Sequence, residues 1–298
     1  NKKIGLMFGP EASGLSNLDL SYANYVVQIP SSPKFKSMNL AHSITLVCYE
    51  IFKLNKSKIQ TYTDQYILKN SDLVIAIGGD GAMLSCSRKY GAKDIPILGI
   101  NLGKVGFLTD IAPDEVTSKL LEVIEGNYDK DKRFFLETNI NNKKERFIAL
   151  NEVVIHSGAI AQLIEFDLFI DETFVYRQKA DGLIVNSPTG STAYSLSGGG
   201  PIMHPSLDAI TILPMFPHSL SSSPLIVSAE SAINIRLSEK SSSAQISFDS
   251  HNFVKLKGKN EIHIGKSQSM LELIHPIDHD FYDGCRSKLG WSTGIAKS

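Results

Sequence analysis

The first third of the chain alternates between two patterns of apolar residues, which are continuous runs and helical spacing. The segment "KKIGLMF" (2–8) predicts a strand. Continuous apolar runs predict buried strands at "DLVIAI" (72–77) and "IPILGI" (95–100), because a strand covered on both faces of a parallel sheet has no polar face. Helical spacing marks residues 38–53, about 82–89, and 116–124, and Gly126 ends the last of these. Strands that alternate with helices predict a parallel α/β layer.

The pattern changes after about residue 130. Segments such as "LIEFDLFID" (163–171) and "AQISFDS" (244–250) alternate apolar and polar residues, as is typical of antiparallel strands with one buried face. We therefore expect an α/β nucleotide-binding domain over residues 1–130, completed by 268–298, and an all-β, sandwich-type domain over residues 131–267. The tail from about Asp280 is predicted as a helix or as an extended return onto the first domain.

Composition narrows the class of protein. The 298 residues include 30 Lys and Arg against 31 Asp and Glu, and this balance gives no long-range attraction to nucleic acid or to an anionic membrane. The three cysteines form no CxxC pair, so neither a disulfide framework nor a zinc site is expected. No apolar run approaches the roughly 18 residues that suggest a membrane span. We expect a cytoplasmic protein with no nucleic-acid or membrane partner.

The first candidate site is Gly78-Gly79-Asp80-Gly81, directly after the strand over residues 72–77. Ligands of open α/β sheets bind beyond the carboxyl ends of the strands, where glycine lets a phosphate approach backbone N–H groups. The alternative is that Asp80 only caps the following helix, since Asp is a favoured N-cap residue. The segment fits neither GxxxxGK[ST] nor GxGxxG.

Three further stretches carry candidate chemistry. The glycine cluster "GINLGKVGFLTD" (99–110) also follows a buried strand, which favours a phosphate-binding crevice where the two strands end. Asn151 and Glu152 are either a solvated strand edge or a pair that hydrogen-bonds a base edge and ribose hydroxyls. The stretch "KADGLIVNSPTGSTAYSLSGGGPI" (179–202) gathers hydroxyls around glycines. It forms either a surface loop or the lining of a polar pocket, and it lacks the GxSxG motif of a hydrolase.

Together these segments resemble the NAD kinase family. The resemblance covers nearly the whole chain, from GGDG through NLGKVGFLTD, NEVVIH, TGSTAYSLSGGGP, FPHSLSSSPL and FDS to a final KLGW. GGDG is shared with phosphofructokinases and with diacylglycerol and sphingosine kinases, whereas TGSTAYSLSGGGP selects NAD kinases. The resemblance implies transfer of the γ-phosphoryl group of ATP to the 2′-hydroxyl of the adenosine ribose of NAD, which gives NADP and ADP.

The resemblance also implies roles for individual residues. Asp80 matches the family's catalytic aspartate, the proposed general base for the ribose hydroxyl. The residues that match NAD- or ATP-binding positions are Gly78, Gly79, Asp80, Gly81, Phe107, Asn151, Glu152, Gln162, Lys179, Asp181, Thr192, Ala193, Tyr194, Ser195, Leu196, Ser197 and His251. One departure is Ala82, where the family usually has Thr, and the missing hydroxyl removes a possible helix cap or phosphate contact.

Fold, assembly and metal use follow from the same resemblance. It implies an NAD kinase/diacylglycerol kinase-like fold and a homotetramer built through the β domain, with Lys179 and Asp181 reaching a neighbouring subunit. The chain has no P-loop lysine, so we expect Mg²⁺ or another divalent metal to arrive with ATP and predict no metal site made by the protein alone. Two alternatives stay open: a lipid or sugar kinase of the GGDG superfamily, and a non-catalytic dinucleotide sensor.

Overall fold

The structure, a computed structural model, describes the backbone of residues 4–8 and then residues 62–102, 106–109, 111–158, 162–219, 222–241 and 244–291. The helix predicted over residues 38–53 lies outside this part. The chain divides into two compact units, one made of residues 1–131 and 271–298 and the other of residues 132–270.

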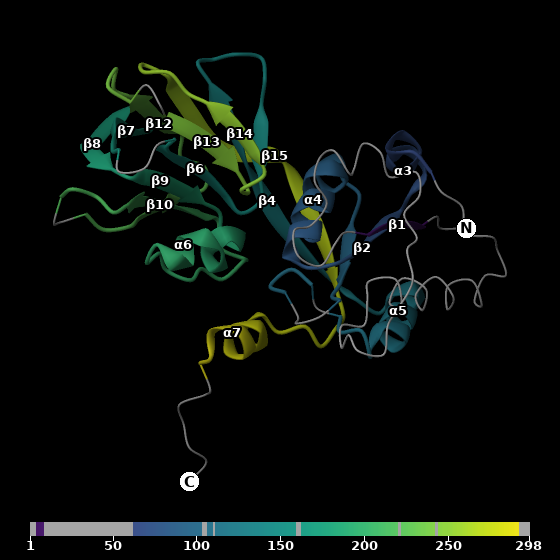
Figure 1. Cartoon of the computed structure of the whole chain (residues 1–298). Helices are drawn as coiled ribbons and strands as arrows, with labels where there is room; N and C mark the ends of the chain where they lie inside the picture. Colours follow the sequence, from purple (N-terminus) through teal and green to yellow (C-terminus); the bar gives the residue numbers. More distant parts are fainter. Residues whose placement is uncertain are drawn as a thin grey trace, which may run out of the picture. The chain divides into compact units, whose positions relative to one another are not determined.

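The first unit contains the parallel sheet that the sequence predicts (Figure 1). Its strands pair in parallel in the order β1 (Ile4–Phe8), β2 (Leu73–Ile77), β3 (Ile97–Ile100) and the last residues of β15 (Glu261–His275). β3 is buried along its whole length and β2 from Val74 onward. This burial explains why these strands read as continuous apolar runs.

Helices accompany the sheet of the first unit. Those in the described part are α3 (Asp64–Asn70), α4 (Asp80–Lys89), the 3₁₀ turn η1 (Gly91–Lys93), α5 (Val116–Glu125) and α7 (Phe281–Leu289). Leu120 and Val123 of α5 pack against Ile75 and Leu98 of the sheet, and α5 ends at Gly126 with φ 95°, as predicted. The tail is a helix rather than an extended segment, because Asp280 caps α7 by accepting the Tyr282 N–H at 2.9 Å.

The second unit is an antiparallel sandwich. One sheet has the order β11-β10-β9-β6-β13-β14, and the other contains β12, β7 and β8, with β15, β4 and β5. The bounds are β4 (Asp129–Ile140), β5 (Phe147–Ala149), β6 (Glu152–Ser157), β7 (Ile164–Ile170), β8 (Thr173–Ala180), β9 (Gly182–Asn186), β10 (Ala209–Met215), β11 (Leu225–Ser228), β12 (Ile233–Leu237), β13 (Ala244–Phe248) and β14 (Asn252–Lys255).

The strand pattern differs in three places from what apolar periodicity indicates. β15 runs unbroken through the polar stretch "KSQS" that separates the apolar segments "EIHIG" and "MLELIH". β4 and β8 are strands that apolar periodicity does not mark, because charged residues occupy the first half of β4 and most of β8 is exposed. "RFIALNEVVIH" breaks at Leu150 and Asn151 into β5 and β6.

The six-stranded sheet has two chemically different faces. Val153, Ile155, Leu183 and Val185 belong to the core shared with the other sheet. The opposite face carries the alternate residues of the same strands, and its apolar members Val154, Ile184, Leu213 and Met215 form a separate small cluster. Glu152 of β6 lies on this second face with Val154, because side chains alternate between the faces of a strand.

Candidate active site

Asp80 lies directly beyond β2 as the first residue of α4. Its carboxylate accepts the Phe107 N–H on Oδ2 and the Leu108 N–H on Oδ1, each at 3.0 Å. The N-cap residue of α4 is Gly79, and no side chain caps this helix. The interpretation of Asp80 as a mere helix cap is therefore wrong, because its carboxylate holds the second glycine cluster instead.

Gly106 allows this close approach of the two loops, and Gly78 allows the tight turn into α4. A Cβ on Gly106 would lie 1.9 Å from Asp80 Oδ1, and a Cβ on Gly78 would lie 2.7 Å from that of Ala82. The Gly106 N–H donates to Thr109 Oγ1 at 2.9 Å, which orients the loop. The two glycine clusters thus meet at one edge of the parallel sheet, as their positions after β2 and β3 predict.

Phe107 lies beside this carboxylate in the first unit. Its backbone N–H points at Asp80, and the ammonium group of Lys288 in α7 lies 4.5 Å from the centre of its ring. The C-terminal helix therefore supports the loop that holds Asp80. The Ala82 departure leaves the backbone of the first turn intact, because the Ala82 N–H donates to the Gly79 carbonyl at 3.0 Å.

Asn151 and Glu152 are held by a carboxylate of the second unit. Asp249 accepts N–H groups from Leu150 at 3.0 Å, Asn151 at 2.8 Å and Glu152 at 3.3 Å. Asn151 is 9% exposed and Glu152 is 3% exposed, so the alternative of a solvated edge is wrong. Asp249 sits at φ 48°, a left-handed conformation that Asp tolerates better than most residues.

Two side-chain oxygens at this point lack protein partners. Asn151 Oδ1 and Glu152 Oε2 are buried and accept no hydrogen bond within the described residues. Burial, followed by the nearby charge of Asp249, raises the pKa of Glu152 to about 8. Since buried polar atoms are nearly always paired, these two acceptors point to a ligand that brings hydrogen-bond donors.

The hydroxyl-rich stretch folds over the same two residues. It forms the 3₁₀ turn η2 (Thr189–Thr192) and the short α6 (Tyr194–Ser197). The Ser187 N–H donates to the Asn151 carbonyl at 2.9 Å, and a Cβ on Gly190 would lie 2.2 Å from that oxygen. Ser187, Ser191 and Ser195 are fully buried, so this stretch is not a plain surface loop.

A cavity of about 500 Å³ opens on the second face of the six-stranded sheet. It brings together three predicted residues from separate segments: Gln162, Asp181 and Tyr194. The other residues that line it are Val154, His156, Ser157, Gly158, Met215, Ser247, Ser250 and Phe253. The cavity is therefore part apolar and part polar, as is usual for small-molecule sites.

Known proteins match both units. Residues 17–128 match the ATP-NAD kinase N-terminal domain, and residues 150–276 match the ATP-NAD kinase C-terminal domain. The NAD kinase of Saccharophagus degradans is 47% identical over 242 residues, which cover 80% of this chain and 82% of that protein. The chain belongs to the NAD kinase family. It is therefore a kinase, that is, a phosphotransferase.

Other members of the family agree with this assignment. The NAD kinase of Azotobacter vinelandii is 49% identical over 228 residues, 75% of this chain and 77% of that protein. The crystal structure of yeast NADH kinase complexed with NADH has a TM-score of 0.73 at 30% identity and covers 80% of this chain and 72% of that one. An NAD kinase from Archaeoglobus fulgidus in complex with ATP has a TM-score of 0.67 at 26% identity, over 86% and 95% of the two chains.

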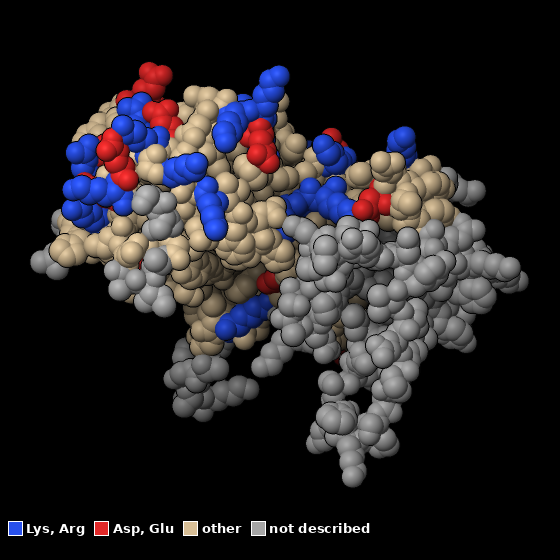
Figure 2. All heavy atoms as spheres, turned by 45° about the horizontal axis from the view of Figure 1, so that its top comes forward, with Lys and Arg blue, Asp and Glu red and all other residues tan. Residues whose placement is uncertain are grey.

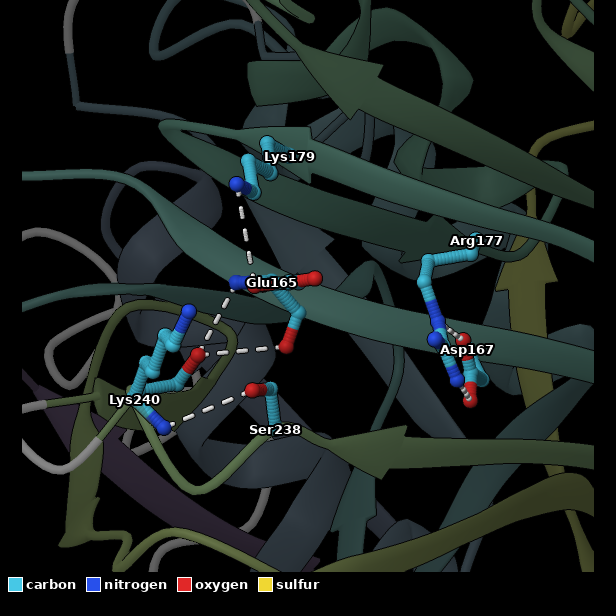
Figure 3. Close-up of polar contacts among 7 residues, drawn as sticks. Glu165, Asp167, Arg177, Lys179, Ser238 and Lys240 are labelled. Atoms are coloured by element: carbon cyan, nitrogen blue, oxygen red, sulfur yellow. Dashed lines mark hydrogen bonds and ion pairs between the residues drawn. The ribbon is translucent and has the colours of Figure 1, made fainter.

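Lys179 and His251 are among the residues predicted from the NAD kinase resemblance that do not line the cavity. Lys179 is exposed on β8, where its ammonium group lies 3.9 Å from the carboxylate of Glu165 on β7 (Figure 3). His251 directs Nδ1 at the Asp249 carbonyl, 3.0 Å away. Neither side chain lines the cavity. The remaining predicted residues of the stretch, Thr192, Ala193, Leu196 and Ser197, belong to η2, α6 and the residue between them.

The sequence did not predict several residues of the candidate site. Asp249 was visible only as part of the FDS segment, and nothing in that segment indicated that it holds three backbone N–H groups. The buried Arg133 of β4 donates to Thr189 Oγ1 at 3.2 Å and so supports η2. His156 and Phe253 line the cavity from strands β6 and β14, and their alternation with buried residues was the available signal.

The described surface of the second unit carries charges of both signs. Acidic and basic side chains are interleaved over the end of the second unit that carries β7 and β8 (Figure 2). Arg177, for example, forms a two-pronged pair with Asp167 at 2.6 and 2.7 Å (Figure 3). In the described part of the chain, no helix is long and apolar enough to cross a membrane.

Proposed function

We propose that this chain transfers the γ-phosphoryl group of ATP to the 2′-hydroxyl of the adenosine ribose of NAD, with Asp80 as the general base. The observation that carries the proposal is the pair of N–H groups, from Phe107 and Leu108, that fixes the Asp80 carboxylate beyond β2. An ionised carboxylate has about four acceptor sites. Each Asp80 oxygen therefore keeps capacity to accept the hydroxyl proton as the oxygen attacks phosphorus.

The second unit supplies the dinucleotide site in this proposal. The free acceptors Asn151 Oδ1 and Glu152 Oε2 suit donor groups such as ribose hydroxyls. The cavity lined by Gln162, Asp181 and Tyr194 suits another part of the same ligand. The phosphates instead suit the glycine amides of residues 78–81, at the N-terminus of α4, because a helix N-terminus attracts anions.

A divalent cation, Mg²⁺ in this proposal, enters with ATP. The described residues hold no cluster of three or more His, Cys, Asp or Glu side chains able to bind a metal. Residues 78–81 carry one carboxylate among glycines, a donor set that fits an ion held mainly by phosphate oxygens and water. The ion would neutralise charge on the transferring phosphoryl group.

Assembly and location complete the proposal. We propose a homotetramer built through the β domain, in keeping with the edge strand β11, where Ile226 is 50% exposed. Mixing Asp80→Asn subunits with Asp181→Ala subunits should restore part of the activity if Asp181 serves a neighbouring subunit's site. We propose a cytoplasmic location, which suits a chain whose three cysteines form no CxxC pair.

A coupled assay tests the reaction. The purified chain with NAD, MgATP and an NADP-specific dehydrogenase should form NADP in solution without lipid vesicles. A lipid kinase would instead label lipid from radioactive ATP and leave NAD unchanged. A non-catalytic sensor would bind NAD in calorimetry and form no product, so each outcome selects one function.

A further inference from the structure

A row of facing residues crosses the floor of the cavity. Phe253 of β14 pairs with Ser247 of β13, Ser247 with Val154 of β6, and Val154 with Ile184 of β9. Directly paired residues of an antiparallel sheet point to the same face. The row therefore places the ring of Phe253 at the outer edge of the face that forms the cavity floor, and three of its members line the cavity.

Phe253 is exposed without an evident structural reason. Its side chain is 60% exposed although it lines the cavity, whereas Val254 beside it packs against the core of the sandwich. An exposed aromatic ring at the rim of a concave site offers a flat apolar face to a ligand, and stacking of a base on such a ring is tolerant of base identity. The next row of the same face completes this surface with polar groups.

His156 lies in that next row, and its hydrogen bond fixes its tautomer. Nδ1 lies 2.8 Å from the Ser157 carbonyl oxygen, which can only accept, so Nδ1 carries the proton. In the neutral ring Nε2 is then an acceptor. Because His156 lines the cavity, Nε2 is the nitrogen that remains for a ligand.

Gly182 keeps the floor open between His156 and Met215. Its Cα pairs with His156 on one side and with Met215 on the other. A Cβ at this position would lie 3.2 Å from the His156 Cβ and 3.0 Å from the Met215 sulfur. A side chain here would fill the space between them, so the glycine leaves room for a flat group on the sheet face.

We infer that Phe253 and His156 recognise a flat nitrogen-containing ring of the dinucleotide, with Phe253 stacking on the ring and His156 Nε2 accepting an N–H from its amino or amide group. The inference rests on the proposed function. NAD carries two such groups, the 6-amino group of adenine and the carboxamide of nicotinamide, and both offer the same chemistry to His156. The phosphates and riboses have no N–H donor.

Phe253→Ala tests the stacking surface. We expect the KM for NAD to rise about tenfold, equivalent to about 1.4 kcal/mol, with kcat and the KM for ATP nearly unchanged. Phe253→Tyr should behave as wild type, because it keeps the ring. The matched control is Phe174→Ala, an exposed phenylalanine of β8 (53% exposed) that does not line the cavity. Equal effects of Phe253→Ala and Phe174→Ala on the KM for NAD would overturn the inference.

His156→Phe tests the acceptor and identifies the ring. Wild type should prefer NAD over the analogue in which hypoxanthine replaces adenine, or over the analogue with nicotinic acid in place of nicotinamide, because each replaces the N–H donor with an acceptor. In His156→Phe, the ratio of kcat/KM for NAD to kcat/KM for one of these analogues should approach unity. That analogue identifies which ring, adenine or nicotinamide, His156 contacts. If wild type discriminates against neither analogue, or if His156→Phe keeps both kcat/KM ratios of wild type, His156 does not accept a hydrogen bond from the ring's amino or amide group.

The same measurements separate this inference from the proposed function. If wild type forms no NADP in the coupled assay, the proposed function fails. If wild type is active while the Phe253 and His156 variants keep its KM values and analogue ratios, only the recognition surface is wrong. Thermal unfolding of each variant close to that of wild type assigns a changed KM to binding, and the analogue ratios of His156→Phe test the inference if Phe253→Ala does not fold.

Discussion

Asp80 and Glu152 are both carboxylates at the ends of strands, yet they differ in burial and in their hydrogen-bond partners. Asp80 is half-buried, and each of its oxygens accepts a backbone N–H. Glu152 is 3% exposed, one of its oxygens has no partner within the described residues, and the Asp249 carboxylate lies nearby. The same functional group therefore occurs once with compensating donors and once without them.

Because their surroundings differ, the Asp80 and Glu152 carboxylates have different roles in the proposed reaction. A carboxylate held by N–H donors beside glycines is fixed in position and can accept a proton from a hydroxyl. A buried carboxyl with an empty acceptor site is stabilised as an ion only when a ligand brings donors. The comparison predicts that changes at Asp80 reduce turnover, whereas changes at Glu152 alter NAD affinity and its dependence on pH.

The largest effect is expected for Asp80→Asn. The amide keeps the shape of the side chain but cannot accept the hydroxyl proton as a base, so kcat should fall by roughly 10²–10⁴ with NAD still bound in calorimetry. Asp94→Asn, at an exposed aspartate of the same unit, is the matched control and should leave kcat unchanged. Near-normal turnover of Asp80→Asn would show that the Asp80 carboxylate only holds the loop.

Gly106→Ala should disturb the same carboxylate without removing it. The new Cβ would lie 1.9 Å from Asp80 Oδ1, so the carboxylate or the loop must move, and misplacement by about 1 Å can cost about 10² in rate. We expect kcat to fall by up to this factor in the coupled assay. Gly265→Ala is the control, because nothing lies within 4 Å of its added Cβ. Equal kcat values for these two variants would contradict the proposed cradle.

Asp249→Asn should weaken the second unit. An amide nitrogen would face one of the N–H groups of Leu150 or Asn151, and loss of one hydrogen bond to a charged group costs about 1.5–3 kcal/mol of unfolding free energy. Asp171→Asn is the control, since Asp171 shares the φ of 48° and accepts one N–H, from Ala232 at 2.8 Å, at an exposed site. Urea unfolding of both variants gives the comparison, and equal losses would argue against a special role for Asp249.

Glu152→Gln should give the smallest effect and the sharpest pH signature. The pKa of Glu152 rises to about 8 in the fold, so the carboxyl holds its proton at neutral pH. If ribose hydroxyls donate to the ionised form, NAD binding releases this proton. NAD affinity should then increase with pH, by at most about tenfold per unit, until pH exceeds the pKa.

Calorimetry in buffers of different ionisation enthalpy measures that proton release. Glu152→Gln should bind NAD several-fold more weakly above about pH 8, abolish the pH dependence and leave ATP affinity unchanged. The raised pKa also has a sign for stability: the contribution of Glu152 to the free energy of unfolding is present below about pH 4.5 and is lost as pH rises to about 8. A flat pH profile in wild type would contradict the assignment.

The sequence determined the class of fold because its periodicities are local. β2 and β3 are buried, so their apolar runs identify them directly, and Gly126 ends α5 as its position indicates. The sequence did not reveal β4 and β8, because β4 begins with a run of charged residues and most of β8 is exposed. Such segments have no apolar periodicity that distinguishes them from a loop. β4 is a strand because it pairs with β15 from a distant part of the chain, and β8 is a strand because it forms a hairpin with the neighbouring β7.

The candidate site, too, could be predicted from the sequence only in part. The types of residue at Asp80, Asn151 and Glu152 identified candidate chemistry from sequence alone, since glycine, amide and carboxylate have few roles in such contexts. Only the tertiary structure decided which groups hold hydrogen-bond partners, because those partners come from far along the chain: Phe107 for Asp80, and Asp249 for the strand that carries Glu152. Burial likewise depends on what packs above a residue, so the raised pKa of Glu152 and the cavity beside Phe253 exist only in the folded chain.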